Sequence, residues 1–158
     1  MKKIYLSLGT NQGSRLENLR KACIELSNYG IKIKAASPIY ETAPWGKSDQ
    51  PWFYNAVLKI DCQYEPNQLL NICLGTEEKL GRIRKIKWDQ RIIDIDILYY
   101  NDLIFESEYL KIPHPEIQNR KFNLLPLVLL DPLLIHPLLN LSLIHISEPT
   151  RLLSIAYA

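Results

Sequence analysis

The sequence predicts an α+β fold of the ferredoxin-like type, a mainly antiparallel sheet with helices packed on it. Strand-like alternation and helical periodicity follow one another in the order strand, helix, strand, strand, helix, strand. This order is the split βαβ pattern of ferredoxin-like sandwiches. With 158 residues, 47% of them hydrophobic, the chain is long enough for one domain with a real core and too short for two ordinary ones.

The first quarter of the chain predicts a strand and a helix. Residues 3–8 alternate apolar and polar side chains, and the sequence GTNQG then breaks the strand. Residues 15–28 carry one apolar helical face. Ser14 and Glu17 predict a capping box at the start of this helix, and Gly30 predicts its end.

The middle of the chain predicts two strands and a second helix. Residues 31–40 form one predicted strand, and the loop ETAPWGKSDQP separates it from the next strand at 53–61. Pro66 suits the first turn of a helix, which we expect to run to about Leu80.

The remaining elements surround an acidic strand within RIIDIDILYY. A hairpin candidate, DLIFESEYLKI, follows it, then the turn PHP and an apolar helix candidate over residues 122–130. We place the domain at residues 1–140. Residues 141–158 resemble, over LSLIHISEPTR, the conceptual translation of a sequencing-library adapter, so we expect a non-native tail in place of the natural C-terminus.

Composition narrows the classes of partner. A net charge of +2 gives no reason to expect nucleic acid or a membrane surface as a partner. Cys23, Cys62 and Cys73 lack metal-ligand spacing and suit buried thiols in a reducing cytoplasm. The start of the chain is too polar for a signal peptide, and no stretch is long enough to span a bilayer. We expect a cytoplasmic monomer.

Asp94 and Asp96 alternate with isoleucines in the acidic strand, so both carboxylates lie on one face and the isoleucines on the other. Two carboxylates roughly 6.5 to 7 Å apart repel by roughly 2 to 3 kcal/mol at an effective dielectric constant near 20. One interpretation is a solvated strand face. The other is a magnesium site completed by substrate phosphates.

A cluster of cations precedes the acid pair, formed by Arg82, Arg84, Lys85, Lys87 and Arg91. A solvated loop is the default interpretation of such a cluster. Beside paired carboxylates, however, it supplies the anion clamp that polyphosphate transfer requires.

Glu77 and His114 each allow two interpretations. Glu77 interrupts an apolar helical stripe, where it either caps the edge of the stripe or orients an arginine or binds a ribose hydroxyl. His114 lies between two prolines, where its imidazole is either a phosphate donor or a plain surface-turn histidine.

Phe53 and Asn55 share a strand face, and the preceding loop offers Thr42, Pro44 and Trp45. An aromatic ring can stack on a flat heterocycle, and an asparagine amide can match the amino-oxo edge of a pterin or purine. The alternative is an aromatic core with an asparagine that satisfies a bulge.

Several motifs together resemble the 6-hydroxymethyl-7,8-dihydropterin pyrophosphokinase family of the folate pathway. The match runs from YLSLGTNQG through YETAPWGKSDQPWFYNAV, EEKLGRIR, RIIDIDIL and IPHPEIQNRKFNLLPL to LIHP, and it covers nearly all of residues 3–137. The resemblance implies a ferredoxin-like fold and transfer of the β,γ-pyrophosphoryl group of ATP to the hydroxymethyl oxygen of the pterin, with release of AMP.

The resemblance also implies residue roles. Asp94 and Asp96 match the ligands of two magnesium ions, and with Arg82 and Arg91 they form the expected catalytic set. The expected ATP-binding residues are Glu77, Arg82, Arg84, Lys85, Arg91, Ile97, His114 and Arg120. The expected pterin-binding residues are Thr42, Ala43, Pro44, Trp45, Phe53, Asn55 and Phe122. We expect the loops at residues 42–51 and 82–91 to close over the substrates as lids.

Two other classes of protein remain as alternatives. A metal-dependent nucleotidyltransferase of the polymerase-palm kind also places carboxylates on such a sheet, but it requires a third acid and a nucleic-acid groove. A non-catalytic RNA-binding or ligand-binding module shows exposed aromatic residues on its central strands and has no need of paired aspartates.

Overall fold

The structure is a computed structural model of the chain, and it describes residues 3–44, 49–82, 92–117, 121–132, 134–136 and 141–142. For residues 121–124, 135–136 and 141–142 the description is limited to the backbone. Within these ranges no helix has the length and apolar character needed to cross a membrane.

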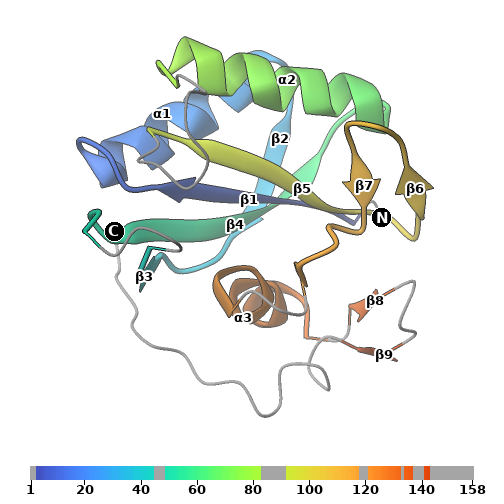
Figure 1. Cartoon of the computed structure of the whole chain (residues 1–158). Helices are drawn as coiled ribbons and strands as arrows, with labels where there is room; N and C mark the ends of the chain where they lie inside the picture. Colours follow the sequence, from blue (N-terminus) through green and yellow to red (C-terminus); the bar gives the residue numbers. More distant parts are fainter. Residues whose placement is uncertain are drawn as a thin grey trace.

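A five-stranded antiparallel sheet forms the centre of the molecule (Figure 1). Four of the strands follow the order β2-β4-β1-β5, and the fifth, β3, also pairs with β4. Their bounds are β1 Ile4–Thr10, β2 Lys32–Ala36, β3 Tyr40–Thr42, β4 Phe53–Asp61 and β5 Asp94–Tyr100.

The single strand predicted over residues 31–40 is wrong, because the structure divides it into β2 and β3. The interruption lies at Ser37 and Pro38. Proline has no N–H to donate to a strand partner. The Ser37 hydroxyl accepts a hydrogen bond from the Val57 N–H at 2.9 Å, where a ladder would use a backbone carbonyl.

Helices cover both faces of the sheet. Figure 1 shows α1 (Arg15–Asn28) and α2 (Pro66–Lys79) on one face and α3 (Lys121–Leu130) on the other. The predicted hairpin after β5 is confirmed as β6 (Phe105–Glu106) paired with β7 (Lys111–Ile112). β8 (Ile135–His136) pairs with β9 (Leu141–Ser142), the part of the predicted tail that the structure describes.

Each face of the sheet has its own apolar core. Between the sheet and the first two helices lie the alternating side chains of β1 and the three isoleucines of the acidic strand, Ile93, Ile95 and Ile97. The predicted isoleucine core face is therefore confirmed. On the other face Tyr5, Val57 and Leu98 pack with Leu127 of α3, and Asp94 and Asp96 belong to this second face by strand alternation.

The capping box predicted at the start of α1 is wrong. Ser14 is the N-cap residue, but its side chain makes no capping hydrogen bond. Glu17 instead forms an ion pair with Arg20 at 2.9 Å. The reciprocal box occurs at α2, where Glu65 and Gln68 satisfy each other's backbone N–H groups. Glu17 has a cationic partner one helical turn away, and this exposed pair replaces the predicted box.

Gly75 offers a stability prediction. It lies inside α2, and an added Cβ would meet the Tyr29 hydroxyl at 3.9 Å as its nearest neighbour. Because glycine in a helix interior is less stable than alanine by about 0.5–1 kcal/mol, Gly75→Ala is expected to raise the free energy of unfolding by that amount in urea denaturation. Gly30→Ala is the matched control, since Gly30 has a φ of +83° and should lose stability. Equal stabilisation by both substitutions would contradict the prediction.

Candidate functional site

Three neighbouring strands bring a row of residues together on the face of the sheet that α3 covers in part. The strand register places Asn55 of β4 beside Gly9 of β1, and Gly9 beside Asp94 of β5. Adjacent strands lie about 4.8 Å apart, so the Asn55 and Asp94 positions are about 10 Å apart. Because Gly9 has no side chain, its backbone forms the floor between them, and the Asn55 Oδ1 and the Phe53 ring lie 3.1 Å and 3.8 Å from where a Cβ of Gly9 would be. The row therefore places a buried amide and a carboxylate on one face of the sheet.

The Asn55 end of the row is polar, and a hydrogen bond holds the Asn55 side chain. Asn55 is 5% exposed, and its Nδ2 donates to the Thr42 Oγ1 at 2.6 Å. Phe53 lies two residues earlier in β4 and so points to the same face. The structure therefore brings Thr42, Phe53 and Asn55 together, as the sequence predicted. Ala43 and Pro44 continue directly from β3 at this end of the row.

Asn11 fixes the loop that leads into β4, and sequence reasoning missed it. The Asn11 side chain is buried, and its Nδ2 donates to the Gln50 Oε1 at 3.2 Å and to the Pro51 carbonyl at 3.0 Å. These bonds join the loop after β1 to the chain just before Phe53. An asparagine directly after a strand, within GTNQG, was the available signal.

Arg15 makes further contacts with this part of the site that the sequence did not predict. Its Nη1 donates to the Glu41 Oε2 at 3.1 Å and to the Trp52 carbonyl at 2.9 Å. Its guanidinium carbon also lies 3.9 Å from the centre of the Tyr54 ring. One side chain of α1 therefore binds both strands that carry Thr42 and Phe53. These partners are 26 to 39 residues away along the chain, which is why local patterns do not predict them.

Glu77 is buried against the acidic strand. It is 1% exposed, and its Oε2 accepts hydrogen bonds from the Ile95 N–H at 2.7 Å and from the Arg82 Nη1 at 3.0 Å. The same Arg82 nitrogen lies 2.6 Å from the Asp94 Oδ1. Of the two interpretations of Glu77, the structure favours the one in which it orients an arginine. The chain Glu77–Arg82–Asp94 joins α2 to the Asp94 end of the row.

Neighbouring carboxylates stabilise the charged form of Arg82. Partial burial of the guanidinium opposes its charge, but the nearby carboxylates of Asp94 and Glu77 outweigh this and raise the pKa of Arg82. The Arg82 side chain is 11% exposed. Arg82 is therefore a permanent cation, and its position is fixed by two acids.

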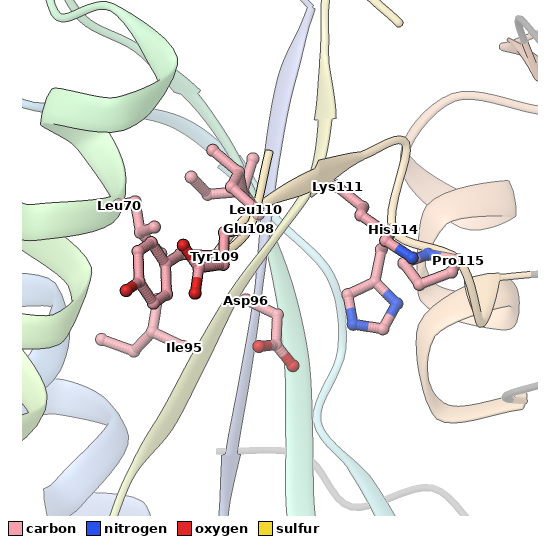
Figure 2. Close-up of a pocket in the computed structure, with 10 residues that line it drawn as sticks. Leu70, Ile95, Asp96, Glu108, Tyr109, Leu110, Lys111, His114 and Pro115 are labelled. Carbon is pink, nitrogen blue, oxygen red and sulfur yellow. The ribbon is translucent and has the colours of Figure 1, made fainter. Parts of the chain in front are cut away.

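A cavity of about 290 Å³ opens beside β5, the edge strand next to the hairpin. Figure 2 shows Leu70, Ile95 and Tyr109 toward one end, Lys111, His114 and Pro115 toward the other, and Asp96 between them. The carboxylate of Glu108 lies beside the Tyr109 ring, so this end combines apolar surface with one acid, whereas the other end carries Lys111 and His114. Its lining residues are Leu70, Ile95, Asp96, Ile97, Glu108, Tyr109, Leu110, Lys111, His114 and Pro115.

His114 is one of the residues that line this cavity. Its Nδ1 accepts a hydrogen bond from the Glu116 N–H at 3.1 Å. A neutral imidazole that accepts at Nδ1 carries its proton at Nε2. The Nε2–H is then the group that can donate to an anion.

The other predicted site residues are placed as follows. Ile97 lines the cavity, and its contact with the nucleotide stays a prediction. Phe122 belongs to α3, which covers the second face of the sheet. Most of the two predicted lids lies outside the described residues, as do the predicted site residues Trp45, Arg84, Lys85, Arg91 and Arg120.

The donor set of the acid pair suits a hard cation. Among the residues that the structure describes, no group of three or more His, Cys, Asp or Glu side chains is arranged to hold a metal. Asp94 and Asp96 supply two carboxylates on one face of β5. Magnesium bound through one or two carboxylates and substrate phosphates needs no larger protein donor set.

Comparisons with known proteins give a consistent result. The family model for 7,8-dihydro-6-hydroxymethylpterin-pyrophosphokinase (HPPK) matches residues 5–132. A 2-amino-4-hydroxy-6-hydroxymethyldihydropteridine pyrophosphokinase of Methylorubrum extorquens is 41% identical over 133 residues, which are 84% of each chain. The folic acid synthesis protein fol1 of Schizosaccharomyces pombe is 44% identical over 134 residues, but the match spans only 18% of that protein.

Solved structures show the same fold. The Plasmodium falciparum HPPK-DHPS A437G structure superposes with a TM-score of 0.73 at 19% identity, and the match covers 94% of this chain and 45% of that one. The fold class and the family resemblance predicted from the sequence are confirmed by these similarities.

Proposed function

The chain belongs to the 7,8-dihydro-6-hydroxymethylpterin-pyrophosphokinase family, and from this premise we propose that it uses ATP and magnesium to pyrophosphorylate 6-hydroxymethyl-7,8-dihydropterin. Pyrophosphoryl transfer to this pterin, a step of folate biosynthesis, is the activity that family membership assigns to the domain. The observation that carries the finer proposal is the row Asn55, Gly9, Asp94. It joins a polar site for a flat ring to a carboxylate site for a metal and phosphates.

The pterin is proposed to lie at the Asn55 end of the row. The Nδ2 of Asn55 donates a hydrogen bond to Thr42, and its Oδ1 is directed toward the floor at Gly9. The aromatic ring of Phe53 lies on the same face of β4 and can stack on the heterocycle. Phe122 of α3 and Trp45 are proposed to complete this pocket.

The nucleotide is proposed to occupy the cavity beside β5, with its base at the end where Ile95 lies. Ile95 directs its N–H away from β1 and toward Glu77. Because backbone polar groups of a strand alternate in direction, those of Ile97 also point away from β1. They can bind the edge of a base as a neighbouring strand would. The triphosphate then extends toward Asp96, His114 and Lys111.

Magnesium fits the acid pair by the chemistry of its donors. Asp94 and Asp96 would hold the ions, which neutralise phosphate charge and so lower the barrier to displacement at phosphorus. Arg82 forms an ion pair with Asp94. Its guanidinium is therefore positioned to contact a phosphate that approaches this carboxylate. Arg84, Lys85, Arg91 and Arg120 are proposed as further phosphate contacts.

The reaction follows from position and charge. The hydroxymethyl oxygen of the pterin bonds to the β-phosphorus of ATP, the bond from that phosphorus to the α,β-bridging oxygen breaks, and AMP leaves. The hydroxymethyl proton is released. Asn55 orients the acceptor, while Glu77 holds Arg82 at the transferred phosphates. No covalent enzyme intermediate is needed, because phosphoryl transfer depends mainly on alignment and charge stabilisation.

The test is AMP release from ATP in the presence of magnesium, with and without 6-hydroxymethyl-7,8-dihydropterin. AMP and the pterin pyrophosphate in equal amounts, formed only when the pterin is present, would support the proposal. Release of ADP, or of AMP without the pterin, would contradict it. The polymerase-palm and binding-module alternatives lose their basis with family membership. The expectation of a cytoplasmic monomer stays a prediction.

Gly9→Ala tests the bare floor between the two substrates. An added Cβ would lie 3.1 Å from the Asn55 Oδ1, closer than this amide tolerates without moving. We expect the variant to bind the dihydropterin about tenfold more weakly, the effect of losing roughly one well-placed hydrogen bond in a buried site. Calorimetric titration with the pterin, in the presence of a non-hydrolysable ATP analogue, measures it.

Gly75→Ala is the matched control for Gly9→Ala, because it adds the same methyl group where there is room. It should bind the pterin as the wild type does. Wild-type pterin affinity in a folded Gly9→Ala variant would show that the ring does not lie on this floor.

A further inference from the structure

We propose that Tyr109 is the residue that stacks on the base of the nucleotide and makes the cavity selective for a ligand with a flat ring. The inference rests on the proposed function, because it names a contact within the proposed ATP site. Neither sequence patterns nor the family resemblance assigned a role to this residue.

Tyr109 is unusually placed for an aromatic side chain. It lines the cavity, yet it is 80% exposed, the largest exposed fraction among the large apolar side chains that the structure describes. A ring this exposed contributes little to the core of the domain. It offers a broad apolar surface whose burial by a ligand would be favourable.

The hairpin holds Tyr109 in place without packing it. The Ser107 N–H donates to the Leu110 carbonyl at 2.9 Å and closes the turn around Glu108 and Tyr109. Leu110, the next residue, is 7% exposed and belongs to the main core. The ring is therefore presented by a turn that is fixed on both sides, so little conformational freedom is lost when a ligand covers it.

The surroundings of Tyr109 suit a base rather than a phosphate. Figure 2 shows its ring at the end of the cavity where Leu70 and Ile95 lie, with His114 and Lys111 toward the opposite end. Leu70 comes from α2 and Tyr109 from the hairpin, so two separate elements supply apolar surface at this end. A purine ring has two apolar faces, and this end of the cavity offers surface to cover them.

Two variants of Tyr109 and two ligands test the proposal. Tyr109→Ala removes the ring and Tyr109→Phe keeps it. Calorimetric titrations use ATP with magnesium and inorganic tripolyphosphate with magnesium, the second ligand having no base. Stacking of one base on an aromatic ring corresponds to a change in the dissociation constant of about tenfold. We expect this loss for Tyr109→Ala with ATP, little change with tripolyphosphate, and near wild-type affinity for Tyr109→Phe with both ligands.

A fluorescent variant gives an independent signal. In Tyr109→Trp the indole should change its emission when ATP is added, after subtraction of the wild-type signal from the native tryptophans, and it should not respond to tripolyphosphate.

Each other outcome is decisive. Wild-type ATP affinity in Tyr109→Ala overturns the stacking role and leaves the proposed function intact. Equal losses with ATP and tripolyphosphate also overturn it, because they show a general disturbance of the cavity. A Phe variant as weak as the Ala variant shows that the hydroxyl group, and not the ring, makes the contact. Failure of the wild-type protein itself to bind ATP would instead count against the proposed function.

Discussion

Asp96→Asn is expected to reduce the rate of pyrophosphoryl transfer by about 10²- to 10³-fold, the loss typical of removing one group that stabilises transition-state charge. The substitution keeps the size of the side chain and removes its negative charge. Asp96 lines the proposed nucleotide cavity and lies opposite Ser7 of β1 in the sheet. Its carboxylate belongs to the same face of β5 as that of Asp94, so both acids can contribute to one metal and phosphate site.

The measurement is AMP release with saturating pterin, followed over a range of magnesium concentrations. Asp102→Asn is the matched control, because Asp102 is exposed in the turn that follows β5 and the chemical change is the same. The control should keep the wild-type rate. If Asp96 holds magnesium, the Asn variant should also need a higher magnesium concentration for half-maximal activity. A variant that keeps the wild-type rate and magnesium dependence would remove Asp96 from the site.

The sequence predicted the parts of the molecule that depend on short-range patterns. The alternation in RIIDIDIL correctly placed the isoleucines in the core, because the period of a strand fixes which side chains share a face. Thr42, which the structure places at the end of β3, and Asn55 of β4 were expected in one site, and a hydrogen bond joins them. The resemblance gave the family, which the comparisons confirmed.

The features that the sequence did not predict depend on contacts between distant segments. Arg15 meets Glu41 and Trp52 only because the sheet brings β3 and β4 to the start of α1. The division of the strand at Ser37 depends on a side-chain oxygen that takes the place of a backbone acceptor. No local propensity contains this information, since the same residues in another fold would have other partners.

Glu77→Ala is expected to lower the free energy of unfolding by about 3 kcal/mol, the low end of the range for breaking a buried ion pair from one side. The substitution leaves the Ile95 N–H without its acceptor and removes one of the two acids that face the Arg82 guanidinium. The remaining contact of Arg82 with Asp94 limits the loss. Chemical denaturation measures the effect. Glu78→Ala is the matched control, because Glu78 is the next residue of α2 and is exposed, and its removal should change stability by less than about 0.5 kcal/mol.

Glu77→Gln separates two of the roles that the sequence left open for this carboxylate, orienting an arginine and binding a ribose hydroxyl. The amide keeps an oxygen for the Ile95 N–H but not the charge that faces Arg82, so stability should fall by less than in the Ala variant. If Glu77 orients Arg82, the Gln variant should transfer pyrophosphate more slowly, while its affinity for adenosine is unchanged because adenosine has no phosphates. If Glu77 instead binds a ribose hydroxyl, adenosine affinity should fall with the charge. Glu77 is 1% exposed and accepts hydrogen bonds from Arg82 and from the Ile95 N–H. Because this leaves the carboxylate little surface for a ligand, we expect the first result.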